Sequence, residues 1–143
     1  MSRNGQTVPV DRTLPPQLDF GSSRAVIAFA ENVEHPVVTP LHAHPRGQLL
    51  YAARGTLTTT VEEGHWVAPP ERAIWIPAEI PHVTRHSFGT ELRSIFVRRN
   101  AIRGLPSRCA VVQVTPLLRE LLLAVIRLPA LYDERGADGR LVR

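Results

Sequence analysis

Four of the six histidines in this 143-residue chain fall into two short clusters, and imidazole nitrogens are common ligands of transition metals. His42 and His44 form the first cluster, and His82 and His86 form the second. Residues two positions apart on a strand face the same side, so His42 and His44 can present two imidazoles to one ion. The alternative interpretation is that they are ordinary histidines of a proline-bounded loop.

The intervals around these histidines match the motifs of a known family. The segment HAHPRGQLLYAARG, residues 42–55, resembles the first cupin motif, in which two histidines, an acidic residue and a glycine recur at these intervals. PAEIPH, residues 77–82, resembles the second cupin motif, with its proline and final histidine in register. The resemblance implies a metal set of His42, His44, Gln48 and His82.

Three positions depart from the cupin pattern. Gln48 stands where cupin enzymes usually have glutamate, Glu79 where the second motif has glycine, and His86 where it ends in asparagine. A neutral amide oxygen is a weaker ligand for a divalent cation than a carboxylate, which disfavours an oxidase-type active site. Three histidines and a glutamine still suit one divalent ion of the zinc or nickel type. A barrel without metal remains the alternative.

The elements that must position these residues are short. Thirteen prolines and nine glycines punctuate mainly the first hundred residues into short apolar runs, which is typical of many strands and not of a helical bundle. The predicted strands are Arg24–Ala30, Val37–His44, Gln48–Ala53, Thr56–Val61, His65–Val67, Ala73–Ile76, His82–Arg85, Leu92–Arg98 and Cys109–Val114. The β-branched run Thr56–Val61, with turn residues on both sides, predicts a hairpin.

One helix is predicted after the strands. Thr115 stands in the capping position and Pro116 in the first helical position, which opens a helix over Leu117–Leu128. Two apolar stripes leave this helix only a narrow polar side, so we expect it to be buried on two sides. We expect it to pack across the open end of the barrel, to meet a partner subunit or another domain, or to do both.

The chain changes character again after the helix. Tyr132–Arg140 is polar and contains glycine, which predicts a linker or an exposed loop. Leu141 and Val142 then begin another apolar element. We therefore expect this chain to be the front part of a longer protein.

A closer resemblance narrows the family. The combination of QLLYA, residues 48–52, and PPERAIWIP, residues 69–77, resembles the amino-terminal sensor domain of AraC-type transcription regulators. The resemblance covers about Val26 to Leu128. It implies a cupin-like barrel that binds a small-molecule effector, a homodimer through the helix Leu117–Leu128, and DNA contact only through two helix-turn-helix units absent from this chain.

The resemblance and the patterning together give the expected architecture. The fold class is mainly β, a cupin-like double-stranded β-helix (jelly-roll barrel) followed by one C-terminal α-helix. The expected divisions are an N-terminal arm (1–23), the barrel (24–114), the helix (115–129) and a linker toward the missing domain (130–143). Tyr51, Trp75 and His86 are weaker candidates for the effector pocket, because Tyr51 and Trp75 lie in apolar strands where core packing is the alternative.

Composition excludes several classes of protein. The formal net charge is +4 and all 17 basic residues are arginine, spread along the chain, which favours a coding bias over a dedicated nucleic-acid surface. The single cysteine, Cys109, permits no internal disulfide and fits a reducing compartment, so we expect a cytoplasmic protein. The first twenty residues lack an apolar core segment, and no stretch predicts a membrane span.

Two further hypotheses remain beside the sensor domain. One is a stand-alone metallocupin enzyme, of the dioxygenase or isomerase type, which uses the same four metal-site residues. The other is a dimerisation module whose histidines bind nothing. No catalytic residue is assigned, because no serine-centred elbow or phosphate-binding glycine loop occurs and Cys109 has no neighbouring histidine. We expect a binding protein and not an enzyme.

Overall fold

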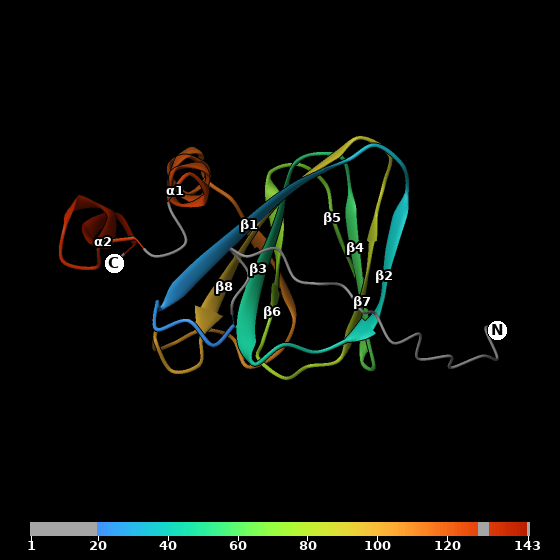
Figure 1. Cartoon of the computed structure of the whole chain (residues 1–143). Coiled ribbons are helices and arrows are strands. Elements are labelled where there is room, and N and C mark those ends of the chain that lie inside the picture. Colours follow the sequence, from blue (N-terminus) through green and yellow to red (C-terminus); the bar gives the residue numbers. More distant parts are fainter. Residues whose placement is uncertain (1–19, 129–131, 143) are drawn as a thin grey trace.

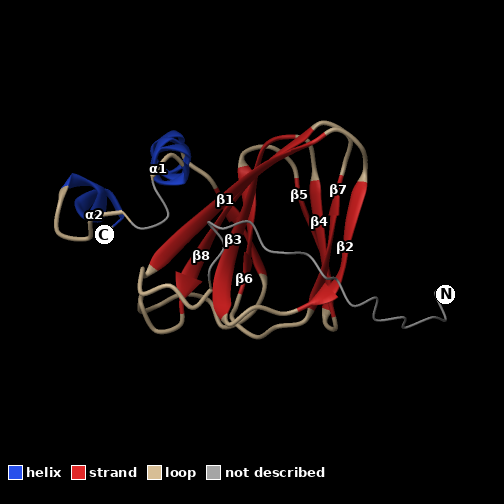
Figure 2. Ribbon diagram, viewed as in Figure 1, coloured by secondary structure: helices blue, strands red, loops and turns tan. Residues whose placement is uncertain are grey.

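A computed structural model describes residues 20–128 and 132–142 of the chain, and within them nine strands form two facing antiparallel sheets (Figures 1 and 2). The strands are β1 (Val26–Val33), β2 (Val37–His42), β3 (Arg46–Arg54), β4 (Leu57–Val61), β5 (Gly64–Ala68), β6 (Arg72–Ile76), β7 (His82–His86), β8 (Thr90–Arg98) and β9 (Ala110–Gln113). Each overlaps one of the nine predicted strands. The mainly β prediction is therefore confirmed.

The order of the strands identifies the barrel. One sheet runs β1-β8-β3-β6-β9 and the other runs β2-β7-β4-β5. Apart from the hairpin β4-β5, consecutive strands among the first eight lie in opposite sheets, which is the strand order of an eight-stranded jelly roll, the architecture of cupins. Strand β9 extends the edge beside β6. The predicted hairpin is present, with Leu57 paired to Ala68 and Val61 to Gly64.

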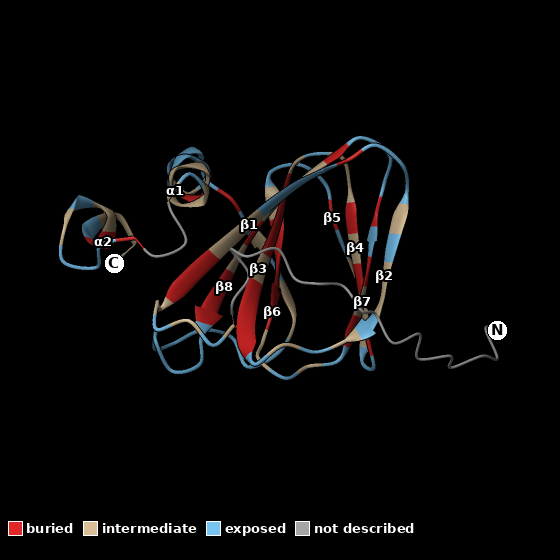
Figure 3. Ribbon diagram, viewed as in Figure 1, coloured by how far each residue is buried: buried red, intermediate tan, exposed pale blue. Residues whose placement is uncertain are grey.

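The space between the sheets is filled by alternate residues of each strand. In β4, Leu57, Thr59 and Val61 are buried while the two threonines between them are partly exposed. The central apolar cluster also contains Leu50, Ala52, Ala68, Ile74, Ile76 and Leu92. Figure 3 shows this burial concentrated along the barrel strands. The period of two therefore fixes which side chains line the interior.

Two glycines are required where the backbone leaves no room for a side chain. Gly55, between β3 and β4, has a φ of 84°, and a Cβ there would collide with Thr90. A Cβ at Gly47 would collide with the indole ring of Trp75. The first glycine turns the chain between the sheets, and the second seats Trp75 against β3.

Helix α1 (Pro116–Ile126) begins as predicted. The Thr115 side chain accepts a hydrogen bond from the Leu118 amide at 3.2 Å, and Pro116 occupies the first turn. One prediction placed this helix across the open end of the barrel, and the structure does not place it there. It packs on the outer face of the larger sheet, where Leu122 is buried with Tyr51 and residues of β6 and β9, because these outward-facing side chains are apolar too.

The segment after α1 differs from the predicted exposed linker. Within it, α2 (Ala137–Val142) forms a second short helix that the sequence did not predict. Tyr132 is only 4% exposed, because its hydroxyl donates to the Val26 carbonyl at 3.2 Å and its ring packs against Arg24. The predicted N-terminal arm lies almost entirely outside the described residues. None of the described helices is long and apolar enough to cross a membrane.

Candidate effector pocket and metal centre

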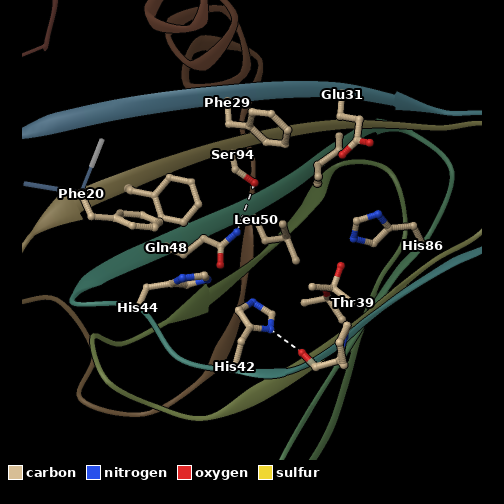
Figure 4. A pocket seen from close by; sticks show the side chains of 14 residues that line it. Phe20, Phe29, Glu31, Thr39, His42, His44, Gln48, Leu50, His86 and Ser94 are labelled. Atoms are coloured by element: carbon tan, nitrogen blue, oxygen red, sulfur yellow. Dashed lines mark hydrogen bonds between the residues drawn. The ribbon is translucent and has the colours of Figure 1, made fainter. Parts of the chain in front are cut away.

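A cavity of about 350 Å³ opens between the two sheets, and most of the chemically interesting residues face it (Figure 4). It is lined by side chains of β1, β2, β3, β7 and β8 and of the adjoining loops, namely Phe20, Phe29, Glu31, Thr39, Pro40, His42, His44, Gln48, Leu50, Thr84, His86, Leu92, Ser94 and Phe96. A volume of this size is within the range of small-molecule pockets in proteins.

The three histidines of the predicted metal set come together beside this cavity, which His42 and His44 line directly. His42 ends β2 and His82 begins β7, and the two are paired across the antiparallel ladder. The ring centroids of His42 lie 4.6 Å from His44 and 4.2 Å from His82, and those of His44 and His82 are 5.0 Å apart. One ligand atom from each ring lies within 4.8 Å of the others.

Two of these rings have a defined tautomer. Nδ1 of His42 lies 2.6 Å from the Pro40 carbonyl oxygen, and Nδ1 of His82 lies 2.7 Å from that of Ile80. A carbonyl oxygen only accepts, so each Nδ1 carries the proton and each Nε2 keeps its lone pair. The Nε2 of His82 is buried and makes no hydrogen bond within residues 20–128 and 132–142. A buried lone pair without a donor is what a metal ligand presents before the ion binds.

The pocket also keeps its histidines neutral. Burial, aided by the neighbouring charges of His42 and His82, lowers the pKa of His44 to about 3 against a smaller opposing effect of Gln48. Burial lowers the pKa of His82 to about 4. Imidazole binds metal only in its neutral form, so His44 and His82 are in the ligating state at neutral pH.

The geometry fits a divalent ion after a small contraction. Zinc–nitrogen bonds of about 2.0–2.1 Å place tetrahedral ligand nitrogens about 3.4 Å apart, so the longest separation must shorten by roughly 1.4 Å. Gln48 on β3 is 6% exposed and its Nε2 donates to Ser94 Oγ at 3.3 Å. Figure 4 shows its Oε1 turned toward His44, beside the histidine cluster. The donor set of three imidazoles and one amide therefore fits such an ion.

The structure does not bring all predicted pocket residues to this cavity. His86 lines it too, and Figure 4 shows its ring apart from those of His42 and His44. Tyr51 follows the inward-facing Leu50 on β3 and therefore points outward, where it is buried beneath α1. Trp75 likewise points outward from β6, and its Nε1 donates to the Pro106 carbonyl at 2.8 Å. Tyr51 and Trp75 thus pack outside the barrel, as their core-packing alternative predicts.

Sequence reasoning missed the aromatic side chains of the cavity, two of which pack against His44. Phe20, Phe29 and Phe96 line the cavity, with the Phe20 ring 5.2 Å from His44 and 5.1 Å from Phe96. Inward alternation along β8 was the available signal, because Leu92, Ser94 and Phe96 all face the cavity. No comparable signal marked Phe20, which precedes the first strand.

Glu79, which stands where the second cupin motif has glycine, has a backbone conformation typical of glycine. Its φ is 64°, which is the left-handed conformation that glycine adopts without strain. Its amide donates to the His44 carbonyl at 2.7 Å, so the turn before β7 is tied to the first histidine segment. The backbone keeps the glycine-type conformation that the second cupin motif calls for, although the side chain has changed.

Comparison with known proteins places this barrel and its pocket in a family. The family model described as the AraC-like ligand binding domain matches residues 25–141. The chain belongs to this family. The HTH-type transcriptional regulator NimR of Escherichia coli (strain K12) is 35% identical over 102 residues, which are 71% of this chain and 37% of NimR. The chain thus spans little more than a third of that relative.

Solved structures agree on the fold of this AraC-like domain. A crystal structure of apo ToxT K231A from Vibrio cholerae superposes with a TM-score of 0.60 at 6% identity, over 85% of this chain and 52% of ToxT. A conserved protein of unknown function from Streptococcus pyogenes, SPY1581, gives a TM-score of 0.50 at 15% identity, over 56% of this chain and 70% of that protein. At these identities the likeness extends to the fold alone.

Proposed function

We propose that this AraC-like domain senses a small-molecule effector in the barrel cavity and that its occupancy controls a DNA-binding unit elsewhere in a longer transcription regulator. The observation that carries the proposal is the cavity between the sheets, which His42, His44 and Gln48 line together with Phe20, Phe29 and Phe96. The regulator relative NimR supports the transcriptional role. Binding, and not catalysis, is the proposed activity of this domain.

The lining defines the class of effector. Among the described residues no arginine lines the cavity, and the one carboxylate there, that of Glu31, is exposed. The lining imidazoles, Gln48 and Ser94 offer hydrogen bonds, while Phe20 and Phe96 offer ring faces. We therefore propose a compact effector with a ring and a polar end directed toward the histidines, where it forms hydrogen bonds in the metal-free cavity.

A divalent ion of the zinc or nickel type is proposed on His42, His44 and His82, with Gln48 as the fourth ligand. Such an ion supplies a positive, coordinating centre at a histidine cluster that otherwise offers only neutral donors and acceptors. The carbonyl contacts of His42 and His82 Nδ1 act as the outer support that holds each ring in its ligating orientation.

A strap of residues 20–25 connects the cavity to the rest of the molecule. Phe20 at its start lies over the cavity, and Arg46, itself 3% exposed, donates to the carbonyls of Phe20, Ser22 and Ala25 at 2.8–3.3 Å. Arg98 donates to the Ser23 carbonyl at 3.1 Å. Because two arginines hold its carbonyls, a shift of Phe20 on ligand binding moves the strap as a unit.

The strap is joined in turn to the segment after α1. Arg24 Nε donates to the Tyr132 carbonyl at 2.8 Å, and its Nη1 lies 3.7 Å from a Glu134 carboxylate oxygen. The Tyr132 hydroxyl donates to Val26, where the strap enters β1. We propose that effector binding biases the position of this segment, with a coupling free energy on the order of 1–3 kcal/mol between pocket and output.

Helix α1 is the proposed dimer contact. Leu117 is 71% exposed and Leu121 is 38% exposed, although Leu122 of the same helix is buried against the sheet. Exposed leucines on one helix suit a partner helix better than water. The proposed partner is a second copy of this chain.

Two titrations test the sensing proposal. Isothermal calorimetry with Zn²⁺ and with Ni²⁺ is expected to show one site that disappears in His42→Ala and His82→Ala but persists in His65→Ala, an exposed histidine outside the cavity. A screen of ring-bearing fragments by protein NMR is expected to give hits whose affinity falls at least tenfold in Phe20→Ala. Phe88→Ala, which removes an exposed ring outside this cavity, serves as the matched control.

Other outcomes contradict the proposal. A folded chain that binds neither metal nor any fragment in the cavity indicates a dimerisation module, and turnover of a bound compound by the metal-loaded chain indicates a metallocupin enzyme. The regulator role is tested separately by the gene, whose reading frame is expected to continue into two helix-turn-helix units. A stop codon directly after Arg143 contradicts that role.

A further inference from the structure

The loop between β8 and β9 carries positive charge that the sensing proposal does not use. Between Leu92 and Arg119 the sequence has six arginines and no aspartate or glutamate. Three of them, Arg98, Arg99 and Arg103, line a hollow of about 750 Å³ to which no carboxylate of the described residues contributes. None of the three forms a salt bridge within the described part of the chain. Arg108 is set apart, because it lines a different pocket with Glu62 and Glu63.

The loop between β8 and β9 is held in place by a hydrogen bond from Trp75 and shaped by two left-handed residues. Trp75, whose ring fills the space above Gly47, donates from Nε1 to the Pro106 carbonyl at 2.8 Å. Asn100 and Gly104 adopt left-handed conformations with φ of 65° and 80°, and the intervening backbone turns sharply. Arg99 and Arg103 are exposed around these turns. The charges therefore stand on an anchored loop at the rim of a concave surface.

Two residues that line the hollow also contact the C-terminal segment. Trp75 and Val97 line the hollow and also form a buried cluster with Val26, against which Val125 of α1 and Val142 of α2 pack. The last described helix thus lies behind the arginine loop. This C-terminal segment therefore packs on the same cluster that anchors the arginine loop through Trp75.

We propose that Arg98, Arg99 and Arg103 bind the phosphodiester backbone of duplex DNA next to the sequence held by the DNA-binding unit of the longer regulator. This inference depends on the proposed function. Guanidinium groups match phosphate oxygens bidentately, and several of them around a carboxylate-free hollow suit a polyanion better than a single small anion. Backbone contacts add affinity without base specificity, so the loop strengthens binding to any sequence that lies beneath it.

The test uses the 143-residue chain and a short fluorescent duplex of arbitrary sequence. Binding is followed by fluorescence anisotropy at several salt concentrations for the wild type, for R99Q/R103Q, and for the charge-matched control R54Q/R119Q. Arg54 and Arg119 are exposed and lie away from the hollow, while Arg98 is kept because it also holds the strap. Each phosphate contact contributes about 0.9 to the slope of log K against log salt.

The expected result is a slope lower by about 1.8 in R99Q/R103Q, which is an affinity loss on the order of 60-fold at 0.1 M salt. The control is expected to change the slope by less than half as much. Equal losses in both variants overturn the proposal in favour of net charge, and so does the absence of DNA binding by the wild type at low salt. If polyglutamate binds through Arg99 and Arg103 while DNA does not, the partner is an acidic protein and the proposal is also overturned. Arg99 and Arg103 do not line the barrel cavity, so R99Q/R103Q is expected to bind metal and fragments there as the wild type does. Failure of this proposal can therefore be distinguished from failure of the proposed function.

Discussion

Acidification is expected to destabilise the metal-free domain through two histidines of the pocket. Burial lowers the pKa of His44 to about 3 and that of His82 to about 4, whereas the unfolded chain restores both to about 6.5. Above pH 6.5 both states are neutral and the two groups contribute no pH dependence. Below pH 6.5 the two histidines bind protons in the unfolded state but stay neutral in the folded state. The free energy of unfolding therefore falls as the pH drops from 6.5 to about 4, where His82 is also protonated in the folded state, and then to about 3, where His44 is.

The size of the effect at pH 5 follows from the unfolded state. Both folded pKa values lie below 5, so each histidine favours the unfolded chain by nearly its full protonation free energy, about 2 kcal/mol. His44 is partly exposed and the two rings are neighbours, which reduces the sum below the simple total. The expected loss between pH 7.5 and pH 5 is about 2–4 kcal/mol, a large fraction of a typical domain stability.

Urea unfolding with a metal chelator present measures this loss. The carboxylates of the chain also titrate, so the comparison is between variants. H44Q/H82Q is expected to lose about 2–4 kcal/mol less than the wild type over the same pH interval, whatever its stability at pH 7.5. H35Q/H65Q removes two exposed histidines and is expected to keep the wild-type dependence. Equal losses in the wild type and H44Q/H82Q would refute the assignment of buried, neutral imidazoles to the pocket.

Three further changes test other parts of the structure. Glu79→Gly relieves a non-glycine residue at φ 64° and is expected to raise the unfolding free energy in urea by up to about 1 kcal/mol; a loss of stability contradicts the strained turn. Tyr132→Phe removes the hydroxyl that donates to Val26 and is expected to cost about 1 kcal/mol and to speed amide exchange in residues 24–26, while unchanged exchange contradicts the link to the strap. L117E/L121E places charges on the exposed face of α1 and is expected to give monomers in sedimentation while the circular dichroism stays unchanged; a wild type that is itself monomeric contradicts the proposed dimer.

Local sequence signals were sufficient for the strands and for the histidine cluster. Turn residues bound each strand, so all nine could be located, and Thr115 with Pro116 marked the start of α1. The shared site of His42, His44 and His82 could be predicted because their segments resemble the two cupin motifs, which are known to lie side by side in the fold. Only residues within such a motif can be placed together from a single sequence.

The rest of the pocket depends on tertiary register. Phe96 and Ser94 reach the cavity because β8 lies between β1 and β3, and nothing local to β8 specifies those neighbours. Tyr51 and Trp75 were ambiguous for the same reason, since a one-residue shift in phase exchanges the cavity face for the outer face. Tyr132 was assigned to a linker because its own neighbours are polar, although its partners, Arg24 and Val26, lie more than a hundred residues earlier.

Those long-range contacts are also the physical basis of the coupling proposed above between the pocket and the C-terminal segment. Arg46 carries its charge into the protein and donates hydrogen bonds to three backbone carbonyls of the strap, which hold that segment in one conformation. Arg24, on the same strap, is bonded to Tyr132. A ligand that displaces Phe20 therefore acts on a segment whose alternative positions cost several charge-assisted hydrogen bonds. Because these hydrogen bonds are lost together when the strap moves, we expect the strap to change between two discrete positions and not to loosen gradually.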